Sequence, residues 1–146
     1  MKSKLLDATG QKTFAIVFDK GDEVIAELTR FAASERVGAA HFTAIGAFSE
    51  VTLGYFQRER KDYKRMAVAE QVEVLSLIGD IALDAKGAPK VHAHVVVGLS
   101  DGQARGGHLL AARVWPTLEV ILVESPAFLR KRHDPDSGLA LIDPAA

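Results

Sequence analysis

The sequence predicts an α+β fold in which a mostly antiparallel β-sheet packs against one main helix. Residues 24–35 are the one segment whose apolar residues recur at helical spacing. Much of the remaining chain consists of short runs rich in apolar and β-branched residues, separated by Gly, Pro, Asp or Ser. The length of 146 residues fits a single domain with a real hydrophobic core.

The first elements are a strand and the helix. Residues 13–19 (TFAIVFD) are typical of a buried strand. Asp22 is expected to cap the following helix by accepting a backbone N–H. Gly38 is placed to end that helix in a left-handed conformation. The predicted buried face of the helix consists of Val24, Ile25, Leu28, Phe31 and Ala32.

Strands are expected over most of the remaining chain. Gly79, in the middle of one of them, predicts a bulge or a sharp bend. Ser125-Pro126 is expected to end the regular pattern, so we predict one domain over residues 1–131 and a C-terminal tail over residues 132–146. The predicted strands are residues 40–48, 51–56, 71–83, 91–99, 104–114 and 117–124.

Composition excludes several classes of function. The chain has no cysteine, which excludes disulfides, a thiolate nucleophile, cysteine-bound zinc and iron–sulfur clusters. The net charge of −1 argues against strong non-specific binding of nucleic acid. No apolar run approaches the ~18 residues that span a bilayer, and no signal-peptide core is present. We therefore expect a soluble cytoplasmic protein with no membrane partner.

Three of the five histidines lie close together in the sequence. His92 and His94 are two residues apart on a predicted strand, so their side chains project from the same face. A short turn at Asp101-Gly102 would bring His108 onto a neighbouring antiparallel strand, where Gly106-Gly107 permits close backbone approach. Three histidines with one open position suit zinc or another divalent transition metal. The alternative is a solvated or structural role, which we expect for His41 and His133.

Four segments carry a family resemblance. They are GAFSEVTLGYF (residues 46–56), EVLSLIGDIA (73–82), the HAH pair, and GGHLLAARVWPTLEV (106–120). In this order they resemble the PPC domain, the plants and prokaryotes conserved domain. The resemblance implies an α+β fold similar to that of the zinc enzyme acetolactate decarboxylase, assembled as a homotrimer, with metal at these histidines in some members. The plant members carry AT-hook motifs; this chain has no RGRP core and resembles the stand-alone prokaryotic type.

A second candidate site is a short basic segment. With its tyrosine available for stacking on a base, it is a possible nucleic-acid patch, repeated three times in a trimer. The alternative is a solvated hairpin loop, because two acidic residues interrupt the run. Its members are Arg58, Arg60, Lys61, Tyr63, Lys64 and Arg65.

Three charged residues on predicted strands are further candidates. Glu73 and Glu119 lie in apolar runs, where either could orient a ligand histidine or act as a general base. The alternative for Glu119 is a cross-strand pair with Arg105 or Arg113, or exposure to solvent. Arg105 is also a candidate for holding an anionic ligand's carboxylate.

Two functional hypotheses follow. The first is a stand-alone homotrimeric module that binds DNA or another protein, with a regulatory role and a three-histidine zinc site. The apolar excess of residues 109–123 is consistent with its subunit interface. The second is a metal-dependent enzyme or small-ligand binder that uses the same histidines, with the metal as a Lewis acid.

Overall fold

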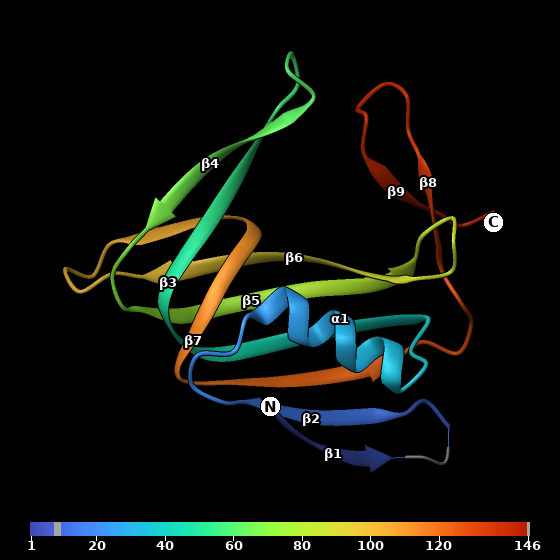
Figure 1. Ribbon diagram of the computed structural model, residues 1–146, viewed down its shortest axis with the longest axis horizontal. Coiled ribbons are helices and arrows are strands. Elements are labelled where there is room, and N and C mark those ends of the chain that lie inside the picture. The colour runs from blue at the N-terminus through green and yellow to red at the C-terminus, as the bar shows by residue number, and fades with distance from the viewer. Residues whose placement is uncertain (8–9, 146) are drawn as a thin grey trace.

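The computed structural model describes residues 1–7 and 10–145 (Figure 1). It confirms the α+β class, because one helix packs on a sheet whose pairings are almost all antiparallel. No helix in the described ranges is long and apolar enough to cross a membrane. The elements are β1 (Lys2–Asp7), β2 (Thr13–Phe18), α1 (Val24–Ser34), β3 (Ala39–Gln57), β4 (Asp62–Val68), β5 (Val72–Leu83), β6 (Pro89–Gly98), β7 (Ala104–Glu124), β8 (Arg130–His133) and β9 (Ala140–Asp143).

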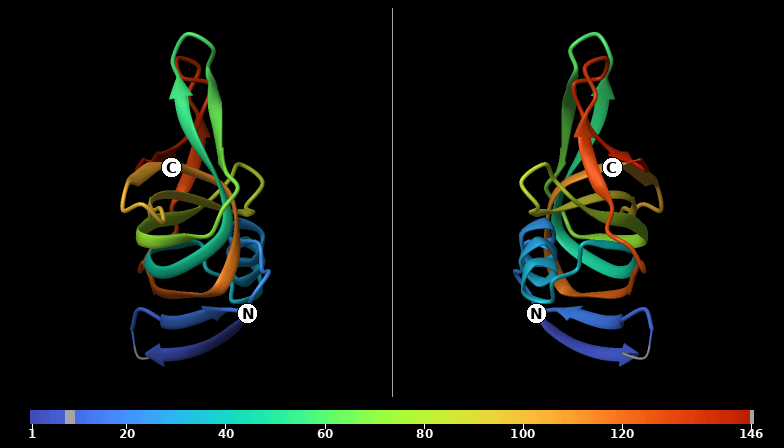
Figure 2. Two further views of the ribbon diagram at one scale, coloured as in Figure 1. Left: turned by 90° about the vertical axis from the view of Figure 1, so that its left-hand side faces the viewer. Right: turned by 90° about the vertical axis from the view of Figure 1, so that its right-hand side faces the viewer.

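The centre of the sheet closes on itself. The main strand order is β1-β2-β7-β3-β5-β8-β9, with β4 paired to β3 and β6 paired to both β5 and β7. Since β3 also pairs with both β5 and β7, the strands β3, β5, β6 and β7 form a closed ring. Figure 2 shows the long strands β3 and β7 curving around this ring. The core lies between α1 and the sheet and includes Phe18, Phe42, Phe48, Leu28 and Leu118.

Two predicted strand breaks are wrong. Ser49-Glu50 lies inside β3, which runs through 19 residues, and Trp115-Pro116 lies inside β7, which runs through 21. Register shifts between β3 and β7 at Gly46/Phe48, Phe48/Glu50 and Thr52/Leu53 bend the strands without ending them. β-Bulges of this kind add twist, so polar residues inside a strand can mark a bend and not a turn.

Gly79 marks a close contact and not a bulge. It pairs in register with Phe42 on β3 and with Ala93 on β6. A Cβ atom there would lie 2.3 Å from Cζ of Phe42 and 2.5 Å from the carbonyl oxygen of His92. Glycine therefore lets β6 and the core aromatic approach β5, and the irregularity of β5 lies between Val74 and Ser76 instead.

The helix forms as predicted, with different capping residues. Its N-cap is Glu23, whose carboxylate accepts a 2.7 Å hydrogen bond from the backbone N–H of Ala26. Asp22, the predicted cap, instead accepts the backbone N–H of Asp19 at 2.9 Å. The Glu23 carboxylate therefore lies over the first turn of the helix, whereas the Asp22 carboxylate lies toward the preceding turn. The buried helix positions are Val24, Leu28, Phe31 and Ala32.

The helix end also differs from the prediction. Arg36, with φ of 57°, adopts the left-handed conformation expected at Gly38. Gly38 is instead needed for packing, because a Cβ atom there would lie 2.1 Å from the Phe128 ring. Glycine at position 38 therefore leaves room for Phe128, which lies in the segment that leads into β8.

Two hairpins stand beyond the closed ring (Figures 1 and 2). The basic hairpin, residues 58–65, contains the turn between β3 and β4 and the start of β4. Its backbone is the hairpin that one of the two sequence interpretations predicted. The C-terminal hairpin, residues 130–143, pairs β8 with β9, and β8 meets β5 where Arg130 pairs with Leu83. The regular pattern thus continues past Ser125-Pro126, contrary to expectation. β8 and β9 are four-residue strands stabilised by pairing with their neighbours. Strands this short show little alternation of apolar and polar residues, so the sequence does not predict them.

Candidate metal centre

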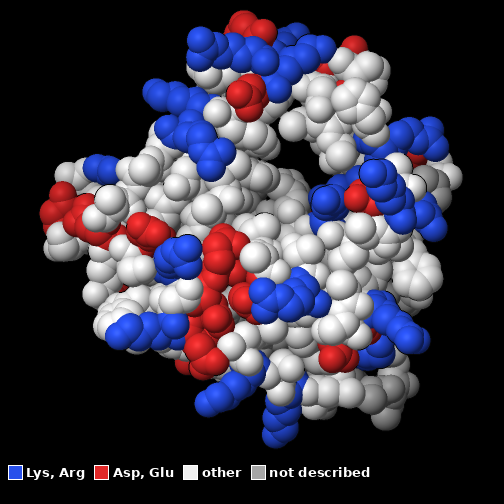
Figure 3. All heavy atoms as spheres, in the orientation of Figure 1, with Lys and Arg blue, Asp and Glu red and all other residues white. Residues whose placement is uncertain are grey.

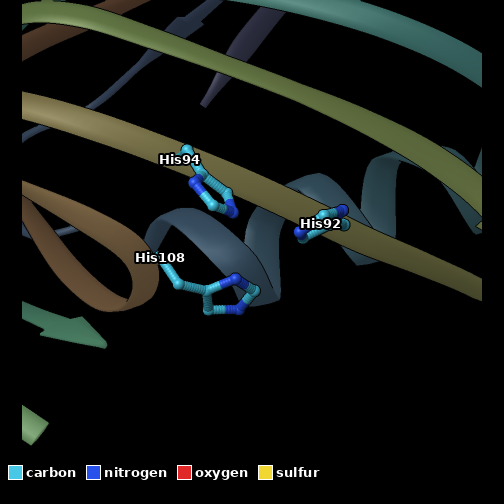
Figure 4. Close-up of side chains that lie close together, drawn as sticks. All are labelled: His92, His94 and His108. Atoms are coloured by element: carbon cyan, nitrogen blue, oxygen red, sulfur yellow. The ribbon is translucent and has the colours of Figure 1, made fainter. Parts of the chain in front are cut away.

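His92, His94 and His108 converge as the spacing predicts (Figure 4). His92 and His94 project from β6, and His108 on β7 is the direct cross-strand partner of His94. One ring nitrogen from each histidine lies within 4.8 Å of the other two. The ring centroids are 5.1–5.4 Å apart. Two adjacent strands therefore present three nitrogen ligands toward one point.

The glycines before His108 let the strands approach closely at this point. A Cβ atom on Gly107 would lie 2.8 Å from the carbonyl oxygen of Gly54 on β3. A Cβ atom on Gly106 would lie 3.2 Å from the carbonyl oxygen of Val95 on β6. The expected close backbone approach is thus present on both sides of β7, and it sets the position of His108 against β6.

Asp80 lies behind the first histidine. Its Oδ2 is 3.1 Å from Nδ1 of His92, its direct cross-strand partner in the β5–β6 register. A carboxylate on Nδ1 fixes the ring orientation and leaves Nε2 as the ligand atom, a common arrangement behind metal-bound histidine. Burial raises the pKa of Asp80, but its contacts with His92 and Lys131 outweigh this and lower it overall. Asp80 is therefore ionised at neutral pH.

Lys131 from β8 is the second partner of Asp80. Its Nζ lies 3.4 Å from Oδ1 of Asp80, and its side chain is only 7% exposed. Oδ1 is buried and makes no hydrogen bond within the described part of the chain, so the ion pair with Lys131 is its polar contact. The C-terminal hairpin thus contributes a nearly buried positive charge directly behind the histidine cluster.

Tyr63 of the basic hairpin lies against the histidine cluster. Its ring stacks on that of His108, with centroids 4.6 Å apart and planes 29° apart. Its hydroxyl is 3.5 Å from Nδ1 of His108. Burial raises the pKa of Tyr63, so the phenol stays protonated at neutral pH. The ring and hydroxyl form one wall beside the histidines.

His94 and His108 have the charge state that metal ligation requires. Burial lowers the pKa of His108 to about 4, with a further contribution from the neighbouring His92 and His94. Burial also lowers the pKa of His94, and the nearby His92 adds to this effect. Neutral imidazoles offer lone pairs to a metal, whereas imidazolium does not. Three imidazole donors, one backed by a carboxylate, fit zinc, copper, iron or nickel and leave a coordination position open.

A cavity of about 530 Å³ opens beside the cluster. Figure 3 shows an opening between the basic hairpin and the C-terminal hairpin, and Nζ of Lys61 joins the two by donating a 2.7 Å hydrogen bond to the carbonyl oxygen of Pro135. His92 and His108 line the cavity, while His94 does not. Its other lining residues are Tyr63, Asp80, Asp84, Lys90, Val91, Lys131, Leu139, Ala140, Leu141 and Ile142.

The structure does not bring the other charged candidates to the histidines. Glu73 and Glu119 are exposed on β5 and β7, and neither lines this cavity. Arg105 is exposed on β7 opposite Val97. Arg113, an expected partner of Glu119, pairs with Glu50 at 3.4 Å. Asp80 is the acidic residue that sequence reasoning missed; its signal was an aspartate within the apolar run EVLSLIGDIA.

The basic hairpin places its cations in solvent, at the top of the molecule in Figure 3. All five basic side chains there are exposed: Arg58, Arg60, Lys61, Lys64 and Arg65. His41 and His133 are exposed on β3 and β8 and lie outside the three-histidine cluster, although His41 is the cross-strand partner of Asp80.

Fold and site together define an α+β protein with a three-histidine cluster on a closed, curved sheet. The sequence profile of the Plants and Prokaryotes Conserved (PCC) domain matches residues 6–126. The chain therefore belongs to this family, as the four sequence segments predicted.

Solved structures of the same fold agree. The plant- and prokaryote-conserved protein of Pyrococcus horikoshii is 30% identical, with a TM-score of 0.86 over 94% of this chain and 97% of that one. A Bacteroides thetaiotaomicron protein named a "putative DNA binding protein" is 26% identical, with a TM-score of 0.87 over 99% of both chains. A metal-containing protein of Archaeoglobus fulgidus is 31% identical, with a TM-score of 0.84 over 95% of this chain and 98% of that one.

Two further similarities are more limited. The α-acetolactate decarboxylase of Bacillus subtilis is 14% identical, with a TM-score of 0.58 over 87% of this chain and 58% of that one, so it shares the fold alone. This confirms the expected fold resemblance. The bifunctional protein GlmU of a Synechococcus strain is 31% identical over 121 residues, and this chain spans 18% of its length.

Proposed function

We propose that this protein binds a divalent transition metal, zinc in the first place, through His92, His94 and His108, and that it binds or converts a small ligand there. The observation that carries the proposal is the convergence of three ring nitrogens within 4.8 Å, beside a carboxylate and a cavity. The metal-containing relative from Archaeoglobus fulgidus, 31% identical over nearly the whole chain, supports it.

Each neighbouring residue has a part in this function. Asp80 orients the His92 ring, and Lys131 holds Asp80 from the opposite side. Tyr63 offers a protonated hydroxyl beside His108, available as a hydrogen-bond donor to a ligand in the cavity. A metal bound there supplies Lewis acidity toward a carbonyl or carboxylate oxygen.

Metal content of the untagged protein after zinc supplementation tests the proposal. We expect about one zinc per chain in the wild type and a loss of most of it in His92→Ala, which removes one of three ligands. His133→Ala is the matched control, because His133 is an exposed strand histidine outside the cluster and outside the cavity. No zinc in the wild type, or equal zinc in both variants, would contradict the proposal.

We also propose the homotrimer that the family resemblance implies. Most large apolar residues of 109–123 are buried in the chain's own core, so of this segment mainly Ile121 is available to an interface. Ile121, Thr43 and Ile78 form a cross-strand row on an exposed face, and Ile78 pairs with His94. The exposed apolar face comprises Ile45 (63% exposed), Leu75 (55%), Ile78 (56%), Val96 (41%) and Ile121 (46%).

Light scattering after gel filtration tests the assembly. We expect three times the chain mass of 15.7 kDa for the wild type. A lysine at the centre of the apolar face, Ile78→Lys, is expected to give monomers, because a buried unpaired charge is costly. A monomeric wild type would contradict the assembly and leave the metal proposal to its own test.

DNA binding is the second candidate function, with a regulatory role in the cytoplasm. The exposed cations of the basic hairpin and the name of the Bacteroides thetaiotaomicron relative favour it. We expect weak, steeply salt-dependent binding that survives removal of the metal. The triple variant Arg60→Ala, Lys64→Ala, Arg65→Ala should abolish a gel shift, and an unchanged shift would eliminate the patch.

A further inference from the structure

We propose that the cavity beside the histidines binds a small organic anion with an apolar part. Its acidic end would ligate the metal, and its apolar end would lie against the C-terminal hairpin. This inference rests on the metal centre proposed above and names the class of ligand that the centre takes.

The cavity has the size and lining of a small-molecule site. Its volume of about 530 Å³ falls within the range of about 300–1,000 Å³ typical of ligand pockets. The C-terminal hairpin contributes Leu139, Leu141 and Ile142 to its wall, and Val91 on β6 adds to them. Leu141 and Ile142 are 47% and 38% exposed. A ligand that covers these apolar side chains removes them from water, which favours its binding.

The charges in the wall call for an anionic ligand. Lys131 pairs with Asp80 at 3.4 Å, and Lys90 pairs with Asp84 at 3.7 Å. The formal charges of these four groups therefore sum to zero. A divalent cation on uncharged imidazoles would keep its double positive charge, which a carboxylate in the open coordination position would partly neutralise.

The C-terminal hairpin, which supplies most of the apolar wall of the cavity, is attached to the rest of the molecule at several points. Arg130 pairs with Leu83 on β5, and Lys131 is nearly buried against Asp80. At the far end, Lys61 donates a hydrogen bond to the carbonyl oxygen of Pro135. These contacts hold the apolar side chains of the hairpin opposite the histidines.

Most of the apolar wall, apart from Val91, lies in a part of the chain outside the family match. The PCC profile matches residues 6–126, whereas the C-terminal hairpin spans residues 130–143. The histidines lie inside the match. The metal centre and the selectivity for the ligand's apolar part thus lie in separate segments of this chain.

Cobalt-substituted protein gives a direct test, because the visible spectrum of Co²⁺ reports a carboxylate that enters its coordination shell. The probes are acetate, butyrate, hexanoate and octanoate. We expect the affinity to rise by up to about fourfold per added methylene, which corresponds to about 0.8 kcal/mol for a fully buried CH₂. Acetate should bind weakly, since it does not reach the apolar wall.

Variants of the hairpin assign the effect to this wall. Leu141→Ser, with Ile142→Ser as a second variant, should flatten the chain-length dependence and leave cobalt content and acetate affinity unchanged. Leu5→Ser on β1 is the matched control, because Leu5 is 45% exposed against 47% for Leu141 and lies outside the cavity.

The outcomes separate the two proposals. Cobalt binding without any chain-length dependence, or without any carboxylate response, would overturn the pocket and leave the metal centre standing. A chain-length dependence that persists in both serine variants would overturn the role of the hairpin. Absence of cobalt binding would overturn both the pocket and the metal centre.

Discussion

Replacing Asp80 with asparagine removes the carboxylate behind His92 and the counter-charge of Lys131 in one step. The Oδ2–Nδ1 distance of 3.1 Å makes this contact the hydrogen bond that orients the His92 ring. Loss of such a carboxylate behind a metal ligand typically weakens metal affinity about 10- to 100-fold. We therefore expect Asp80→Asn to bind zinc about 10- to 100-fold more weakly than the wild type.

The same change should also lower the free energy of unfolding. Lys131 is 7% exposed and Asp80 is 30% exposed, and their charged atoms are 3.4 Å apart. Breaking a fully buried ion pair costs about 3–5 kcal/mol, so partial exposure of Asp80 reduces the expected loss to about 1–3 kcal/mol. The double variant Asp80→Asn, Lys131→Met removes the stranded charge and should recover most of this stability without recovering zinc affinity.

Competition with a chromogenic zinc chelator measures the affinity, and urea unfolding of the chelated protein measures the stability. Asp84→Asn is the control for affinity, because Asp84 lines the same cavity and pairs with Lys90, while its hydrogen bonds in the described residues go to the backbone of Lys86 and Ala88 and not to a histidine. Zinc affinity of Asp80→Asn within twofold of the wild type would refute the role assigned to Asp80. Recovery of affinity in the double variant would show that stability, and not ring orientation, was responsible.

Two further predictions concern the strand contact beside His92 and the titration of His108. Gly79→Ala places a Cβ atom 2.3 Å from Cζ of Phe42 and 2.5 Å from the His92 carbonyl oxygen. We expect this clash to lower the free energy of unfolding by about 1–3 kcal/mol. An unchanged urea midpoint would disprove the contact. The pKa of His108 is about 4 in the folded chain against 6.5 ordinarily, so the unfolded chain binds more protons between these values. The chelated protein should therefore lose about 1–2 kcal/mol between pH 7.5 and pH 4.5, after allowance for partial solvation of the ring, and a His108→Gln variant that loses as much would contradict this origin.

The histidine cluster was predictable because its geometry is local. Residues two apart on a strand share a face, which places His92 beside His94. The tight turn after β6 makes β7 its antiparallel neighbour, which places His108 opposite His94. The apolar face of the helix was readable for the same reason, since its period is fixed by backbone geometry.

Asp80, Tyr63 and Lys131 depend on long-range pairing that local pattern does not show. Asp80 reaches His92 through the β5–β6 register, which an irregularity between Val74 and Ser76 shifts. Tyr63 lies in a run of charges and was assigned to it by composition, but its strand turns the ring onto His108. Lys131 reaches Asp80 because a short strand docks on β5 at a single pair of residues.

X-ray absorption at the zinc edge tests the central claim most directly. Loaded wild-type protein should show one zinc per chain with three imidazole nitrogens at about 2.0–2.1 Å and one further light ligand. His108→Ala should lose an imidazole from that shell or lose the zinc. A shell of oxygen ligands without imidazole, or an identical spectrum from the variant, would contradict the three-histidine centre.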